Sequence, residues 1–191
     1  MSNIELVFPE IFISLSIMFL LILGVFKKNS SKIIHNFSLL ILLITAVITF
    51  NETLSVDPTN LFNESIVIDY LSSFMKIITL LAAFVVLLIS SNYLRAFKIF
   101  KIEYPILILS SVLGMMIMIS SNDLMVFYMG LELQSLALYV LATFNRDQLK
   151  SSEAGLKYFV LSALSSGLLL YGCSLIYGFT GSTNFNVIST Q

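Results

Sequence analysis

The sequence predicts an all-α, polytopic membrane protein with about six transmembrane helices. Its 191 residues are 58% hydrophobic and only 11% charged, whereas soluble domains carry about 25% charged residues. The hydrophobic residues gather in long blocks that can each cross a bilayer, and the lysines and arginines between the blocks fall on one side only. Together these observations favour a chain that crosses a membrane repeatedly.

A membrane-spanning helix needs roughly 20 predominantly apolar residues. Six stretches meet this requirement: 7–26, 33–50, 66–91, 104–121, 124–144 and 152–179. Lipid-exposed backbone must satisfy its own hydrogen bonds, so these stretches are expected to be helices. The first is expected to remain as a span, because it opens with acidic residues and no small-residue cleavage site follows it. We therefore treat residues 1–191 as one transmembrane helical region.

The charges in the predicted loops are distributed unevenly. Eight cations lie in the loops that follow the first, third and fifth helices: Lys27, Lys28, Lys32, Arg95, Lys98, Lys101, Arg146 and Lys150. The amino terminus and the other loops carry acidic residues and no cation. Because loops rich in lysine and arginine are retained in the cytoplasm, both ends of the chain are expected on the external side.

Several classes of function are disfavoured by the composition. The net charge is −1, so no basic surface suggests a nucleic acid partner. Cys173 is the only cysteine and His35 the only histidine, and no Cys/His cluster has metal-ligand spacing. The sequence has no glycine-rich phosphate loop and no dinucleotide fingerprint. We expect no metal and no cofactor in this chain.

Glu132 is the residue most out of place in a membrane. It lies about 12 Å along the fifth predicted helix, close to the middle of the bilayer. Tyr128, Ser135 and Tyr139 would share its face of the helix. A buried carboxylate that can hold or release a proton suits a proton relay. The alternative is a glutamate that merely holds neighbouring helices together.

Lys157 lies early in the sixth predicted helix, with Glu153 one turn before it. Two interpretations are open from its position. It can act within the membrane, or it can be an interfacial lysine that pairs with Glu153. Farther along the same helix, Ser162, Ser165, Ser166 and Gly167 form a small-residue surface that predicts close helix packing.

Three other residues in the apolar stretches have simpler interpretations. Lys76, near the external end of the third helix, is expected to reach towards water beside Asp69. His35 is interpreted as an interfacial residue at the start of the second helix. Cys173 is interpreted as a small filler of the core and not as a reactive thiol.

Specific sequence motifs surround Glu132 and Lys157. The chain reads LMVFYMGLELQSLALYVLATF at 124–144, SEAGLKYFVL at 152–161 and LLLYG at 168–172. These segments closely resemble the antiporter-like subunit N of bacterial NADH:quinone oxidoreductase, which is subunit 2 of mitochondrial respiratory complex I. The core GLELQSL followed by EAGLKYF is the most specific part, and FMK at 74–76 also fits.

The resemblance implies a fold of about fourteen membrane helices with inverted repeats, of which this chain is the first part. Glu132 matches the fifth-helix glutamate of that family and Lys157 its sixth-helix lysine, and both would take part in proton translocation. The lysine partner of Glu132, on a broken seventh helix, would lie beyond Gln191. We therefore expect either the amino-terminal portion of a longer protein or a split subunit.

The same resemblance implies a membrane-arm subunit of an enzyme that couples quinone reduction to proton pumping. Quinone, NADH, FMN and iron–sulfur clusters are expected in other subunits, and the partners are other membrane-arm subunits and the lipid bilayer. The expected location is the bacterial inner membrane, with both termini of this portion periplasmic; the alternative is the mitochondrial inner membrane. Two other functions stay open: a subunit of a multi-subunit sodium/proton antiporter, and a packing module that carries no protons.

Overall fold

The computed structural model describes residues 5–26, 31–53, 59–97 and 99–190. In chain order its elements are η1 (Glu5–Val7), α1 (Phe8–Phe26), α2 (Ser31–Thr53), β1 (Thr59–Leu61), β2 (Ile66–Ile68), α3 (Tyr70–Ala96), α4 (Glu103–Ser120), α5 (Leu124–Ala142), α6 (Leu149–Thr180) and α7 (Phe185–Ser189). Six of these helices, α1 to α6, are long and apolar enough to cross a membrane. The predicted class, an all-α multi-pass membrane protein, is confirmed.

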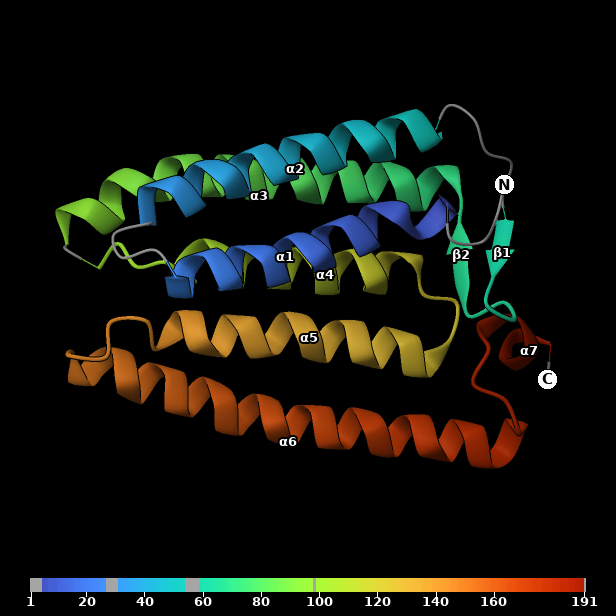
Figure 1. Ribbon diagram of the computed structural model, residues 1–191. Coiled ribbons are helices and arrows are strands. Elements are labelled where there is room, and N and C mark those ends of the chain that lie inside the picture. The colour runs from blue at the N-terminus through green and yellow to red at the C-terminus, as the bar shows by residue number, and fades with distance from the viewer. Residues whose placement is uncertain (1–4, 27–30, 54–58, 98, 191) are drawn as a thin grey trace.

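The six long helices lie side by side with their axes roughly parallel (Figure 1). The first four pack around a shared core, with α5 on α4 and α6 on α5 at the outer edge. Fully buried side chains of this core come from α1 to α4: Ile13, Leu20, Ile34, Leu42, Leu80, Leu87, Leu109 and Met116. Only Gly155 and Cys173 of α6 are buried. The chain thus has a closed four-helix part and a more open edge formed by α5 and α6.

A β-hairpin precedes α3, which hydropathy alone did not predict. The predicted third helix begins at residue 66, but residues 66–68 form β2, which pairs antiparallel with β1, and the helix begins at Tyr70. Asp69 sets this boundary, because its carboxylate accepts a bond from the Ser72 amide at 2.7 Å while the Ser72 hydroxyl accepts from the Asp69 amide at 2.9 Å. The β-branched residues Ile66 to Ile68 then suit a short strand.

The junction between α4 and α5 is short and tightly packed. Asp123 caps α5 by accepting bonds from the amides of Met125 at 2.8 Å and Val126 at 3.4 Å. Gly114 of α4 and Gly130 of α5 face each other so closely that a Cβ on Gly114 would lie 2.7 Å from the Gly130 carbonyl oxygen. Two glycines therefore allow the backbones of α4 and α5 to approach each other.

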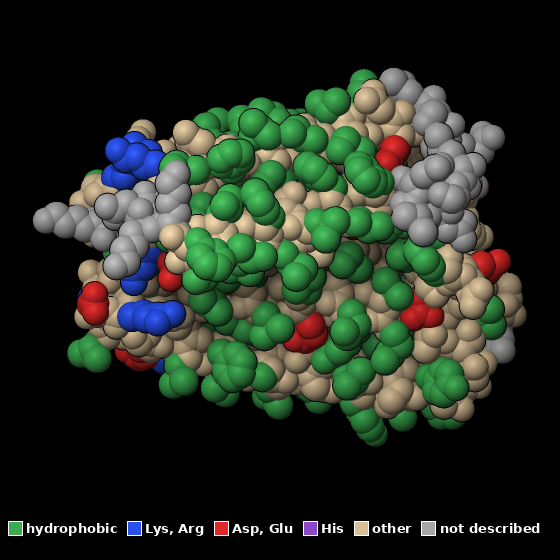
Figure 2. Space-filling model, viewed as in Figure 1, with side chains coloured by type: hydrophobic (Ala, Val, Ile, Leu, Met, Phe, Trp, Pro, Cys, Tyr) green, Lys and Arg blue, Asp and Glu red, His purple; other side chains and the backbone are tan. Residues whose placement is uncertain are grey.

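The two ends of the bundle differ in charge. One end of the bundle, which we call the basic end, carries five described cations at helix ends or in loops: Lys32, Arg95, Lys101, Arg146 and Lys150. On the face shown in Figure 2, lysine and arginine gather at this end. Lys27, Lys28 and Lys98 lie outside the described residues. The opposite end, with the β-hairpin and α7, is the hairpin end.

Candidate functional site

Glu132 lines a polar pocket between α5 and α6. The pocket has a volume of about 250 Å³. Its polar lining residues are Glu132, Ser135 and Tyr139 from α5 and Ser162, Ser165 and Ser166 from α6. Hydroxyl groups therefore surround a carboxyl group near the middle of a membrane-spanning helix. Of the predicted polar face of α5, Tyr128 alone is not part of this lining.

One oxygen of Glu132 is buried without a partner. Its Oε1 atom has no hydrogen-bond partner in the part of the chain that the structure describes. An unsatisfied buried carboxylate oxygen is costly, so it calls for a proton, a water molecule or a cation. The pocket exceeds the roughly 30 Å³ that a water molecule occupies in the liquid. Water bound between Glu132 and the serine hydroxyls would satisfy the group.

The serines of α6 line a pocket, whereas the sequence predicted that they pack against a neighbouring helix. Ser162 and Ser166 are half-buried and face the pocket, so they line a polar space and do not form a dry packing surface. Gly167 lies on the outside of α6, where an added Cβ would meet nothing within 4 Å. The predicted packing role of Gly167 is not seen among the described residues. The helix contact is made instead at Gly155, whose added Cβ would clash with Thr143, the residue that follows α5.

Aromatic rings complete the contact between α5 and α6. Tyr139 is buried, and its ring lies edge-on to Tyr158 at 4.9 Å and to Phe159 at 5.6 Å between centroids. Such edge-to-face pairs add about 0.5–1.5 kcal/mol beyond the burial of area. These contacts hold one end of the pocket and fix which face of α6 turns towards Glu132.

Lys157 lies apart from Glu132. Its Nζ donates to Glu153 Oε1 at 2.6 Å, and the two side chains are 68% and 62% exposed. At about 100° per residue, Lys157 is about 180° around α6 from Ser166, which faces the pocket. The structure therefore shows the pair with Glu153 that was one of the two interpretations, and it does not bring Lys157 and Glu132 together.

The prediction for Lys76 is wrong. Lys76 is only 2% exposed, and its Nζ donates to Glu10 Oε1 at 2.5 Å. It turns inward to α1 and does not reach water beside Asp69, whose carboxylate caps α3. Glu10, one of the acidic residues expected at the external amino terminus, is itself buried within α1. The sequence did contain a signal for this pair, because Glu10 and Lys76 are opposite charges that lie in two apolar stretches near the same end of the membrane span.

His35 and Cys173 are both buried. The His35 ring packs against Phe100 with 5.6 Å between ring centroids, so it lies beneath an aromatic ring at the basic end. Cys173 is a buried free thiol of α6, as a small core residue would be. Among the described residues, no three His, Cys, Asp or Glu side chains are grouped so that they could hold a metal ion.

Known proteins are similar in sequence to this chain over nearly its whole length. Subunit N of the NADH-quinone oxidoreductase of Pelagibacter ubique is 72% identical over 98% of the chain, and that of Maricaulis maris is 50% identical over 98%. The chain is therefore similar to subunit N over nearly all of its length. It spans 40% and 39% of the lengths of these two subunit N sequences. Residues 121–191 also match the family described as NADH:quinone oxidoreductase/Mrp antiporter, TM.

Chains of solved structures share the fold of this protein. A chain of respiratory complex I from Thermus thermophilus matches 92% of it with a TM-score of 0.78 and 27% identity, over 38% of that chain. A chain of the Mrp complex from Dietzia matches 96% of it with a TM-score of 0.72, over 36% of that chain. At 22% identity, the second match shows the fold alone. The antiporter-like resemblance seen in the sequence is thereby confirmed.

Proposed function

We propose that this chain belongs to a membrane-arm subunit of a proton-translocating NADH:quinone oxidoreductase. The identity of 72% with a subunit N over 98% of the chain supports this assignment. The observation that carries the mechanism is the unpartnered Oε1 of Glu132 in a pocket lined by hydroxyl groups. In the whole enzyme, NADH, FMN, iron–sulfur clusters and quinone bind to other subunits, and this chain moves protons without redox chemistry.

Glu132 is the proton-carrying group in this proposal. Its free oxygen takes a proton from water in the pocket, and the hydroxyl groups of Ser135, Ser162 and Ser166 hold that water in place. Return of the proton to water restores the carboxylate. A nearby cation would favour the ionised form, and we propose that a lysine on a further membrane helix of the subunit supplies it.

Lys157 is proposed as a second proton-carrying group, on the other face of α6. Only 6% of the α6 span is buried, so the face that carries Lys157 is open to further helices. Packing there would remove the Lys157–Glu153 pair from water and strengthen its electrostatic interactions. Under this proposal the residues 1–191 form the first part of the membrane domain of a longer subunit.

The test is Glu132→Gln in the assembled enzyme complex, in inverted membrane vesicles. Glutamine keeps the shape and the hydrogen-bonding capacity but cannot exchange a proton, so proton pumping should fall by about tenfold or more while assembly survives. Glu103→Gln, an exposed carboxylate at the first turn of α4, is the matched control and should pump normally. Normal pumping by Glu132→Gln would reject the role of Glu132.

The packing-module alternative makes a different prediction for the same residue. If Glu132 only bonds helices together, Glu132→Gln keeps pumping and Glu132→Leu impairs assembly, because leucine cannot form a hydrogen bond across the polar pocket. The sodium/proton antiporter alternative rests on a fold match at 22% identity. Dependence of proton movement on NADH oxidation, and not on a sodium gradient, would separate the enzyme from the antiporter.

A further inference from the structure

A second buried ionisable pair lies in the four-helix part, away from the pocket of Glu132. Lys76 of α3 donates to Glu10 of α1 at 2.5 Å, and the two side chains are 3% and 10% exposed. Replacing a buried ion pair with apolar residues is often neutral or stabilising, so such a pair is weak evidence of a purely structural role. Ionisable residues inside membrane spans are costly and usually functional.

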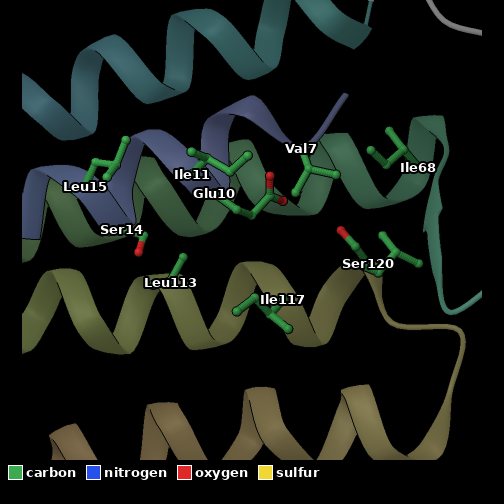
Figure 3. Close-up of a pocket in the computed structure, with 10 residues that line it drawn as sticks. Val7, Glu10, Ile11, Ser14, Leu15, Ile68, Leu113, Ile117 and Ser120 are labelled. Atoms are coloured by element: carbon green, nitrogen blue, oxygen red, sulfur yellow. The ribbon is translucent and has the colours of Figure 1, made fainter. Parts of the chain in front are cut away.

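The pair leaves hydrogen-bonding capacity unused. Glu10 Oε2 is buried without a partner among the described residues, and so is Ser120 Oγ at the end of α4. Both residues line one pocket of about 370 Å³ between α1, α4 and β2 (Figure 3). Most of the remaining lining is apolar, as at Leu113 and Ile117. Two unsatisfied polar atoms in a space of this size are the conditions for bound water.

Other charged groups near the pair come from neighbouring helices. Glu52, near the end of α2, interacts electrostatically with both Glu10 and Lys76. The carboxylate of Asp69 caps α3 by accepting a hydrogen bond from the Ser72 amide. The only charged residue of α4 is Glu103, which lies at the basic end. The cluster therefore holds two carboxylates, Glu10 and Glu52, and one ammonium group, which donates to Glu10, and burial disfavours the uncompensated negative charge. One added proton would balance the charges of these three groups.

We propose that this pocket is a hydrated proton-exchange site at the hairpin end, separate from the site of Glu132. A hydronium ion in the pocket transfers its proton to Glu10 Oε2, which leaves a neutral water molecule and a carboxylic acid, and the reverse step releases the proton. Lys76 Nζ donates to Oε1 and holds it in place throughout. The inference rests on the proposed function in one respect: proton movement is measured in the enzyme complex.

The first test removes both charges together. Glu10→Leu with Lys76→Met replaces the pair by apolar residues of similar size, so neither member of the pair is left buried alone, and Glu52 remains half-buried near the end of α2. In inverted vesicles carrying the assembled complex, we expect normal assembly and about tenfold fewer protons pumped per second, because a positioned acid–base group is lost. Either single substitution should assemble less well than the double one, because it strands a charge.

The second test fills the pocket without touching the pair. Ile117→Phe occupies the space for water and should lower proton pumping several-fold, whereas Ile89→Phe, at a position 70% exposed on α3, is the control and should pump normally. Wild-type pumping in Ile117→Phe overturns the proposal, as does wild-type pumping in the double variant. If the double variant does not assemble, Ile117→Phe alone decides.

Parallel measurement of Glu132→Gln separates the two ideas. Loss of pumping in Glu132→Gln together with normal pumping in Ile117→Phe and the double variant rejects the second site and leaves the proposed function intact. Normal pumping in Glu132→Gln with a loss in Ile117→Phe rejects the role of Glu132 and keeps the site at Glu10.

Discussion

Glu132 and Glu10 are both carboxylates inside apolar helices, but they have different neighbours. Glu10 of α1 accepts a hydrogen bond from Lys76 of α3, whereas Glu132 Oε1 faces hydroxyl groups and a pocket. Lys157 differs from both, because its partner Glu153 is on its own helix and exposed. At the scale of single residues, it is the surrounding helices that decide whether a charge is paired, hydrated or solvated.

Replacing Lys157 separates its stability role from its proposed proton role. An exposed Glu–Lys pair on a helix contributes only about 0.3–0.5 kcal/mol, so Lys157→Met should leave the melting temperature nearly unchanged. If Lys157 carries protons, pumping in the assembled complex should still fall several-fold. Glu153→Gln breaks the same pair while keeping the lysine, and it should pump normally. Equal pumping by Lys157→Met and the wild type would contradict the role of Lys157.

The contact between α4 and α5 positions Glu132 at the scale of elements. Gly130, two residues before Glu132, lies against the backbone of α4, where its added Cβ would come within 2.9 Å of the Met118 amide nitrogen. Backbone atoms cannot move aside as a flexible side chain can. The depth and rotation of α5, and with them the direction of Glu132, therefore depend on this close approach.

Substitution of Gly130 tests that contact. Gly130→Ala should destabilise the protein in detergent by about 1–3 kcal/mol through overpacking, despite the roughly 1 kcal/mol that alanine gains in helix propensity. Gly172→Ala on α6 is the control, because its Cβ would meet nothing within 4 Å and should be neutral or stabilising. Thermal unfolding of the two variants provides the comparison. A Gly130→Ala variant as stable as Gly172→Ala would show that α4 and α5 can separate freely.

The whole molecule has two distinct ends. At the hairpin end, the side-chain amides of Asn122 and Asn184 both donate to the Glu64 carbonyl, at 2.9 and 3.0 Å, and the Thr183 hydroxyl donates to Asp123 at 2.5 Å. These bonds tie the hairpin, the α4–α5 junction and the segment before α7 together. At the basic end lie the described cations of the helix ends and loops. This asymmetry is what a fixed orientation in a membrane requires.

Labelling can establish that orientation. In a Cys173→Ala background, Asn186→Cys on α7 should react with a membrane-impermeant maleimide on intact cells, because we propose that the hairpin end is periplasmic. Lys150→Cys at the basic end should react only after permeabilisation. Both positions are exposed, so access to the thiol is not limited by burial. Labelling of Lys150→Cys, and not of Asn186→Cys, on intact cells would show that the orientation is the opposite one.

The sequence by itself determined the membrane class, the six helices and Glu132 as the candidate residue, because hydrophobic length and a charge in an apolar block are local properties that one chain segment carries alone. It did not predict the hairpin, because the apolar residues 66–68 fit the start of a membrane helix as well as a strand. Only the tertiary structure decided which charges meet. The Glu10–Lys76 pair joins helices far apart in the chain, and hydropathy does not indicate which helix faces contact each other.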